Sequence, residues 1–285
     1  MIPKLTAFIL THKVTVALGL VLAIAFMGGG VFLFNTFQKA QQEAPLEETE
    51  ITFDAEGPYV KLFPRRDGNA LVMQIQRIAS YDSFAYAITY TDIDGIDRGA
   101  GHEDTWINIE KGKGEYEQEI LFGSCSKNVC KYDQGVENGT LVLRIRKGNK
   151  ASRMNLLWHL QKPDVALGNL TSGDNNFSYK LDQKREELAL IGFTIINDVT
   201  GVPKLPNEKE VLGKVYSVNV SISKALPEGQ AAVNLAENPP SDAKVARYNF
   251  SENKWVEYET KIDGSKLSAK ADGEGIFAVL ADKEK

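Results

Sequence analysis

The chain has 285 residues, 43% of them hydrophobic and 25% charged, which is the balance of a globular protein and excludes wholesale disorder. The net charge is −5. The first forty residues hold three lysines and no acidic side chain, so the rest carries 30 basic and 38 acidic residues, a net of −8. An acidic body of this kind repels phosphate backbones, so we expect no nucleic-acid partner.

The N-terminal part contains one long apolar stretch. Residues 14–34 carry no charge and, at 21 residues, match the roughly 20 that a helix needs to cross the hydrocarbon core of a bilayer. Only a helix satisfies its backbone within a single such segment, so the sequence predicts a transmembrane helix over 14–35. Lysines precede the span and glutamates follow it, which predicts a cytoplasmic N-terminus over 1–13 and an extracytoplasmic body in a plasma-membrane protein.

A cleaved signal peptide is the alternative interpretation of this stretch. The apolar core of a signal peptide is usually about 7–15 residues long and ends in a small-x-small cleavage site. The core here is longer, and residues 37–40 offer no such site. We therefore favour a retained signal anchor, although retention and cleavage are not separated by sequence alone. The polar, acidic residues 36–50 are predicted to form a stalk.

From residue 51 onward the dominant hydrophobic period is two. Leu71, Met73 and Ile75 alternate with Val72, Gln74 and Gln76. Tyr216 and Val218 alternate with a serine and an asparagine. Successive strand residues point to opposite faces, so the pattern predicts sheets with one face on a core. Asx-Gly pairs that suit tight hairpin turns separate these stretches.

The spacing of these stretches predicts an all-β body of two tandem immunoglobulin-like β-sandwich domains, over 51–161 and 162–285. The strands expected in the first domain lie near 59–63, 70–78, 84–91, 105–109, 116–122, 140–147 and 152–160. Those expected in the second lie near 188–197, 214–222, 230–236, 243–249, 254–259, 266–271 and 275–281.

Cys125 and Cys130 are the two cysteines of the chain. In an oxidising compartment such a pair is expected to form a disulfide. A redox-active pair is less well supported, because thioredoxin-like chemistry uses two intervening residues beside a βαβ pattern and this pair has four. Metal binding would need further ligands, and the segment supplies none. We therefore predict a structural disulfide, with redox or metal chemistry as the alternative.

The sequence carries no recognisable catalytic constellation. His12, His102 and His159 form no metal-binding pair at helical spacing. We therefore predict no catalytic residues, no enzymatic activity and no cofactor.

Carboxylates are plentiful but scattered, and the best cluster lies between Asp92 and Asp104. Asp92, Asp94 and Asp97, together with Glu103 and Asp104, form a weak candidate for calcium, which prefers oxygen ligands. The glycine of this stretch does not fall at the sixth position of an EF-hand loop, so a solvated hairpin loop is the preferred interpretation.

The C-terminal stretch over about 245–281 has a tyrosine-containing strand, a strand with Trp255, a short strand with Leu267 and a closing Gly275–Ala278 segment. It resembles the closing hairpins of ZU5-like β-sandwich domains in bacterial surface proteins. The stretch around the two cysteines is similar to uncharacterised membrane-anchored proteins of small-genome bacteria. The resemblance implies an envelope protein and transfers no functional residue.

Three functions are weighed on these observations. The first is a membrane-anchored, non-enzymatic surface or envelope interaction or scaffold module, with an envelope protein or glycan as partner. The second is a glycan- or peptide-binding module, calcium-assisted if the aspartate loop binds metal, in which Trp106, Trp158 and Trp255 could stack on sugars. The third is an enzyme of unrecognised type. The fold class alone does not choose between them.

Overall fold

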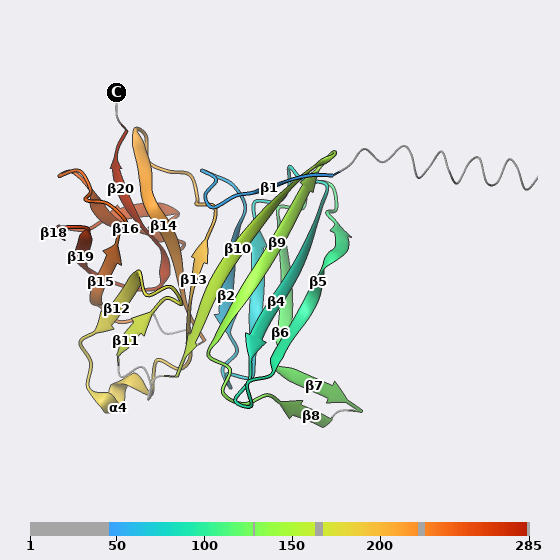
Figure 1. Ribbon diagram of the computed structural model, residues 1–285. Coiled ribbons are helices and arrows are strands. Elements are labelled where there is room, and N and C mark those ends of the chain that lie inside the picture. Colours follow the sequence, from blue (N-terminus) through green and yellow to red (C-terminus); the bar gives the residue numbers. More distant parts are fainter. Residues whose placement is uncertain (1–45, 128, 163–167, 222–225, 284–285) are drawn as a thin grey trace, which may run out of the picture. The chain divides into compact units, whose positions relative to one another are not determined.

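The computed structural model describes residues 46–127, 129–162, 168–221 and 226–283 (Figure 1). Within these ranges no helix combines the length and the apolar character needed to cross a membrane. The predicted cytoplasmic segment 1–13, the predicted transmembrane helix 14–35 and the stalk up to residue 45 lie outside the described residues. The described residues from Glu48 onward form one compact unit.

This body is almost entirely β, as the sequence predicts. The strands of its first part are β1 (Glu47–Glu50), β2 (Tyr59–Pro64), β3 (Ala70–Gln76), β4 (Ser83–Thr91), β5 (Asp97–Asn108), β6 (Glu115–Leu121), β7 (Gly123–Ser126), β8 (Val129–Tyr132), β9 (Asn138–Lys147) and β10 (Lys150–Gln161). The elements of its second part are β11 (Asn169–Thr171), β12 (Phe177–Leu181), α4 (Arg185–Leu188), β13 (Thr194–Val199), β14 (Lys209–Val220), β15 (Gly229–Asn234), β16 (Lys244–Asn249), β17 (Lys254–Glu257), β18 (Thr260–Asp263), β19 (Lys266–Ala271) and β20 (Gly275–Asp282).

One sheet runs through both parts of the body. Its strand order is β17-β16-β20-β14-β13-β10-β9-β4-β5, and β1 also pairs with β10 (Figure 1). The link between the parts is the antiparallel pairing of β10 with β13, in which Trp158 lies opposite Asn197 and Gln161 opposite Thr194. We call residues 51–161 the first half and residues 168–283 the second half. The predicted boundary at 161/162 follows β10, and the two halves share this main sheet.

Two smaller sheets cover opposite faces of the main sheet. The layer β2-β3-β6 packs on the first half through a core that includes Leu62, Phe84 and Trp158. The layer β11-β12-β15-β19-β18 packs on the second half through a core that includes Tyr179 and Phe277. The alternation of strand residues shows that the faces differ, because neighbours on β13 point into different cores, Ile195 into the first and Ile196 into the second.

A third apolar cluster lies where β2 meets the second half. Tyr59 of β2 joins Val199, Ala246, Ile276 and Ala278, which come from the main sheet. β20 has the core of the second half on one face and this third cluster on the other. Its residues Gly275–Ala281 are therefore buried without interruption. A strand covered on both faces is expected to read as a continuous apolar run, and GIFAVLA does.

The structure corrects the prediction that one face of the β14 stretch is free of the core. Ser217 and Asn219, which alternate with its apolar residues, are buried beneath β2. Asn197 of β13 lies on the same face and donates a hydrogen bond from Nδ2 to the Val60 carbonyl, at 2.9 Å. The polar residues of this stretch therefore form a buried seam between β2 and the main sheet. The seam leads to the pocket described below.

Two further local predictions differ from the structure. The stretch 188–197, predicted as one strand, divides into the end of helix α4, a turn, and β13, which begins at Thr194. Residues 47–50, predicted as the end of the stalk, form β1, where the Glu48 carboxylate accepts a hydrogen bond from Arg144 Nε at 2.8 Å. The stretch EETE, three glutamates and a threonine, carries no apolar alternation, so its pairing with the sheet depends on basic and amide partners such as Arg144 and Asn155.

Candidate functional site

Cys125 and Cys130 are joined by a disulfide in the β7–β8 hairpin, as predicted. The two residues lie directly opposite each other in the ladder and are exposed. This hairpin forms a two-stranded sheet of its own beside the larger sheets. The bond therefore holds the two strands of the hairpin together and leaves the buried cores untouched.

The predicted carboxylate loop is a short turn followed by a long strand. Asp92 accepts hydrogen bonds from the N–H groups of Asp94 and Ile96 and from Arg98 Nε, and β5 begins at Asp97. The Ile96 N–H, with the Arg98 guanidinium and the Asp94 N–H, outweighs burial and lowers the pKa of the Asp92 carboxyl. Asp97 accepts from Thr91 Oγ1 at 2.8 Å.

The geometry of this turn bears on the calcium alternative. Within the described part of the chain, no group of three or more His, Cys, Asp or Glu side chains is arranged to hold a metal ion. Glu103 and Asp104, predicted in the loop, lie within β5. The Asp92 and Asp97 carboxylates accept hydrogen bonds from protein donors, and these contacts shape the turn.

The β4–β5 turn and the β7–β8 hairpin lie at the same end of the body (Figure 1). Both carry large aliphatic side chains that are exposed. Ile93 and Ile96 lie in the β4–β5 turn, and Val129 lies in the hairpin; Ile93 is 73% exposed and Val129 is 74% exposed. The turn contacts the chain that follows the hairpin, because the Ile93 N–H donates to the Gln134 carbonyl at 2.7 Å. We call these three side chains the apolar end.

The three tryptophans do not form a common surface. Trp158 is buried in the core of the first half, stacked on Phe122 at 5.7 Å between ring centroids. Trp255 packs against the third apolar cluster. Trp106 lies in β5, and the Arg144 guanidinium covers its ring, with Arg144 Cζ 5.0 Å from the centroid of the Trp106 ring. The structure therefore does not bring them together into a sugar-stacking platform.

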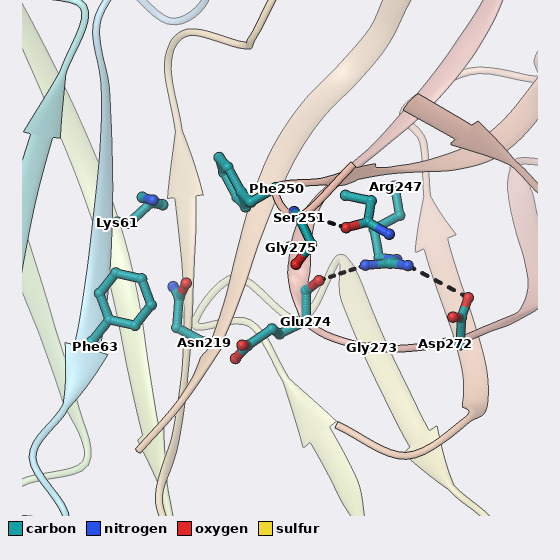
Figure 2. Close-up of a pocket in the computed structure, with 11 residues that line it drawn as sticks. Lys61, Phe63, Asn219, Arg247, Phe250, Ser251, Asp272, Gly273, Glu274 and Gly275 are labelled. Atoms are coloured by element: carbon teal, nitrogen blue, oxygen red, sulfur yellow. Dashed lines mark hydrogen bonds and ion pairs between the residues drawn. The ribbon is translucent and has the colours of Figure 1, made fainter. Parts of the chain in front are cut away.

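A pocket of about 330 Å³ lies between β2 and the second half (Figure 2). We call it the junction pocket. Its lining comes from β2, from the end of β14, from β16 with the turn after it, and from the β19–β20 loop: Lys61, Phe63, Asn219, Arg247, Asn249, Phe250, Ser251, Asp272, Gly273, Glu274 and Gly275. Binding sites commonly occur at such junctions between structural halves.

Lys61 is the most unusual residue of the junction pocket. It is only 7% exposed, yet among the described residues its ammonium has no hydrogen bond or ion pair. Its Nζ lies 4.1 Å from the centroid of the Phe250 ring and 5.4 Å from that of Phe63, so cation–π attraction compensates part of the lost hydration. Burial lowers the pKa of Lys61 despite the attraction of Glu115 and Glu274.

Glu274 is the opposite charge of the junction pocket. Its Oε2 accepts a hydrogen bond from the Val220 N–H at 3.2 Å. Burial raises the pKa of this carboxyl, against the lowering effects of that hydrogen bond and of Lys61 and Arg247. Lys61 and Glu274 attract each other electrostatically but are not close enough to form an ion pair. Among the described residues, each therefore lines the pocket without a charged partner in contact.

Arg247 braces the loop that carries Glu274. Its Nη1 donates to the Glu274 carbonyl at 2.8 Å, its Nε donates to Tyr258 Oη at 2.9 Å, and its Nη2 lies 3.5 Å from Asp272 Oδ1 (Figure 2). Gly273 has a φ of +77°, and a Cβ at this position would lie 3.2 Å from Arg247 Nη1. Arg247 is therefore occupied by the protein itself and positions the loop.

The turn after β16 supplies the aromatic wall. Asn249 Oδ1 accepts hydrogen bonds from the N–H groups of Ser251 and Glu252, at 3.0 and 3.4 Å, which fixes the turn. The turn places Phe250 over Lys61, and Phe250 packs edge-on against Tyr248 at 5.2 Å. Figure 2 shows Lys61 and Phe63 on one side, Glu274 and Arg247 on the other, and Asn219 between them.

None of these residues belongs to a site predicted from the sequence. Lys61 alternates with Val60 and Leu62 in β2, so the pattern places it on the face opposite the core of the first half, where a lysine ordinarily meets water. The covering of this face by the second half depends on β10–β13 pairing. No local signal in the sequence predicts that pairing. The sequence therefore does not show that Phe63 and Phe250 lie beside Lys61 in one pocket.

Neither a protein-family model nor a curated protein matches this chain.

Proposed function

We propose that the chain is a single-pass, membrane-anchored extracytoplasmic protein whose β body acts as a non-enzymatic interaction or scaffold module in the cell envelope. The predicted span over 14–35 holds it in the membrane, and its partner is an envelope or surface protein or glycan. The resemblance of its C-terminal stretch to ZU5-like domains, and the two-domain immunoglobulin-like organisation, belong to the same proposal.

The observation that carries this proposal is the exposed cysteine pair. Cys125 and Cys130 face each other across a hairpin ladder at the surface, where soluble reductants reach them. A reducing cytoplasm keeps such thiols reduced, whereas an oxidising exterior joins them. The disulfide supports an extracytoplasmic body, in agreement with the charge pattern around the apolar span.

The apolar end is the contact surface that suits this role. Ile93, Ile96 and Val129 expose aliphatic surface on a turn held by Asp92 and on a hairpin tied by the disulfide. Restraining loops before binding lowers the entropy lost on association. Rigid, exposed aliphatic groups of this kind are what a protein partner would bury.

Site-specific photocrosslinking in cells tests the proposal. A photoreactive residue at position 129 or 93 of the full-length protein is expected to give a discrete envelope adduct after illumination. Lys180, exposed on the five-stranded layer, provides the matched control position and is expected to give none. A lack of adducts at both 129 and 93, or identical adducts at all three positions, would contradict the assignment of the apolar end.

A second candidate function is the binding of a small glycan or peptide ligand, and the junction pocket favours it. The pocket combines aromatic walls with a buried ammonium and a carboxylate that do not pair. Thermal unfolding of the full-length protein in detergent, with glycan and peptide panels and with calcium or a chelator, tests this role. Ser251→Trp, on the exposed rim, is expected to abolish any ligand-induced shift by blocking the entrance. A shift that survives in this variant would place binding elsewhere.

A further inference from the structure

We infer that the junction pocket binds a small zwitterion, a molecule with a carboxylate for Lys61, an ammonium group for Glu274 and an apolar side chain for the phenylalanine rings. This inference rests on the ligand-binding role proposed for the pocket and names its ligand class. Amino acids and dipeptides are the molecules with this chemistry.

The charge balance of the pocket selects a zwitterion over a simple anion. Four charged side chains line it, and two of them, Arg247 and Asp272, are partners of each other at 3.5 Å. The remaining two are Lys61 and Glu274, one of each sign. A phosphate, with two negative charges, would meet Lys61 but would be repelled by Glu274. A molecule with one charge of each sign complements both.

The cost of leaving these charges unpaired points to a ligand. A buried ammonium without a charged or hydrogen-bonding partner is unfavourable, and cation–π contact replaces only part of its hydration. Lys61 nevertheless lies against Phe250 and does not contact Glu274. Glu274 accepts one hydrogen bond, from the Val220 N–H, and has no charged partner in contact among the described residues. Charged groups that line one pocket without contacting an opposite charge are typical of binding sites, where a ligand supplies the partner.

The size and walls of the pocket agree with a ligand of this class. A volume of about 330 Å³ lies at the lower end of the range for small-molecule sites. Phe63 and Phe250 provide apolar surface beside the ammonium, and Asn219 provides an amide between the two charges. Arg247 fixes the Glu274 loop in advance, so little ordering is needed on binding.

Isothermal titration calorimetry of the full-length protein in detergent tests the inference. The probes are L-phenylalanine, glycyl-L-phenylalanine, 3-phenylpropanoate and 2-phenylethylamine. The first two are zwitterions with different charge separations, and the last two each lack one charge. At least one zwitterion is expected to bind about tenfold or more tightly than both single-charge analogues, because the loss of one partner leaves a buried charge unpaired.

Two variants of the pocket connect each charge with its partner. Lys61→Met is expected to weaken zwitterion binding by about tenfold or more and to remove the preference over 2-phenylethylamine. Glu274→Gln is expected to weaken zwitterion binding and to remove the preference over 3-phenylpropanoate. Lys150→Met, which removes an exposed lysine of β10, is the matched control and should bind as the unmodified protein does.

Three results would overturn the inference. The first is no binding of either zwitterion, and the second is equal binding of zwitterions and single-charge analogues. The third is binding that both pocket variants retain. Ser251→Trp separates this inference from the ligand-binding role on which it rests. If that variant abolishes binding while Lys61→Met and Glu274→Gln retain it, the pocket still binds a ligand, but not through its two charges.

Discussion

At the residue scale, the structure departs from ordinary surface chemistry at Lys61. A lysine on the outer face of a covering strand would normally extend into water, but here Phe250 and the second half enclose it. A buried charge that is only partly compensated usually costs stability, and its replacement by an apolar side chain of similar shape is often stabilising. Lys61 is therefore expected to lower the stability of the unliganded protein.

We predict that Lys61→Met raises the free energy of unfolding by about 1–3 kcal/mol near neutral pH, because a thioether packs well against aromatic rings. The pKa of Lys61 is lowered from 10.5 in the folded state, so the unfolded chain binds the proton more tightly. The unmodified protein thus gains stability as the pH rises from the lowered pKa towards 10.5, and its difference from the variant narrows. Thermal unfolding measures both effects. Equal or lower stability of the variant at neutral pH would contradict the prediction.

A second residue-scale requirement concerns Gly201, which pairs with Asp54 in an isolated parallel bridge. A Cβ at this position would overlap the Gly57 carbonyl and lie 2.6 Å from the Pro58 carbonyl oxygen, so both partners are backbone atoms that cannot rotate away. We predict that Gly201→Ala lowers the free energy of unfolding by about 1–3 kcal/mol. Gly114→Ala is the control, because the nearest atom to its Cβ would be 4.0 Å away. Similar melting temperatures for the two variants would show that the chain before β2 relaxes freely.

At the element scale, Asp174 ties the β11–β12 turn to the main sheet. Its carboxylate accepts hydrogen bonds from Ser172 Oγ at 2.6 Å and Tyr216 Oη at 3.0 Å, and it lies 3.1 Å from Lys214 Nζ. Burial alone would raise the pKa of Asp174. The Ser172 and Asn176 hydrogen bonds and the ion pair with Lys214 outweigh burial and lower the pKa to about 2.

The lowered pKa of Asp174 gives a pH-dependent contribution to stability. Folding favours the ionised carboxylate, so the contribution is complete above the ordinary pKa of 3.8 and is lost as the pH falls towards about 2. We predict that Asp174→Asn lowers the free energy of unfolding by about 1–2 kcal/mol at neutral pH. The difference should shrink below pH 3.8, as chemical unfolding at several pH values would show. Asp263→Asn, at an exposed position in β18, should have no such effect; a constant difference at all pH values would contradict the account.

The strands that the sequence predicts well are those whose alternation is set by local contacts. Leu71 and Met73 in β3, and Leu141 and Leu143 in β9, are fully buried as predicted. Among the strands that were not predicted, β1 has no apolar alternation and β11 is only three residues long. β12 does alternate, with Phe177, Tyr179 and Leu181 buried, so its pattern was present in the sequence and was overlooked. The junction pocket was missed for a different reason, because burial of Lys61 depends on which strands pair across the two halves.

At the scale of the whole body, one sheet joins what the sequence predicts as two domains. β10 and β13 pair over four residues in register, and β2 of the first half contacts both β13 and β14 of the second. Asn197 adds a buried hydrogen bond to β2. Loss of either half would leave a long sheet edge and the third apolar cluster uncovered, so neither half is expected to be stable without the other.

We therefore predict one cooperative unfolding transition for the body. Hydrogen exchange measured by mass spectrometry should give the same opening free energy for β9 in the first half and β20 in the second. The β7–β8 hairpin, outside the larger sheets, provides the internal contrast and should exchange faster. Separate opening free energies for β9 and β20 would show instead that the halves unfold as independent domains.

The location of the body outside the cytoplasm is the claim on which the proposed function depends, and the thiols of the hairpin report on it directly. The chain contains two cysteines, so a mass-tagged maleimide that does not cross membranes labels Cys125 and Cys130 alone. On intact cells we predict no labelling before reduction and two tags after treatment with a reductant that stays outside. Labelling that requires lysis, and that proceeds without reductant, would contradict the account.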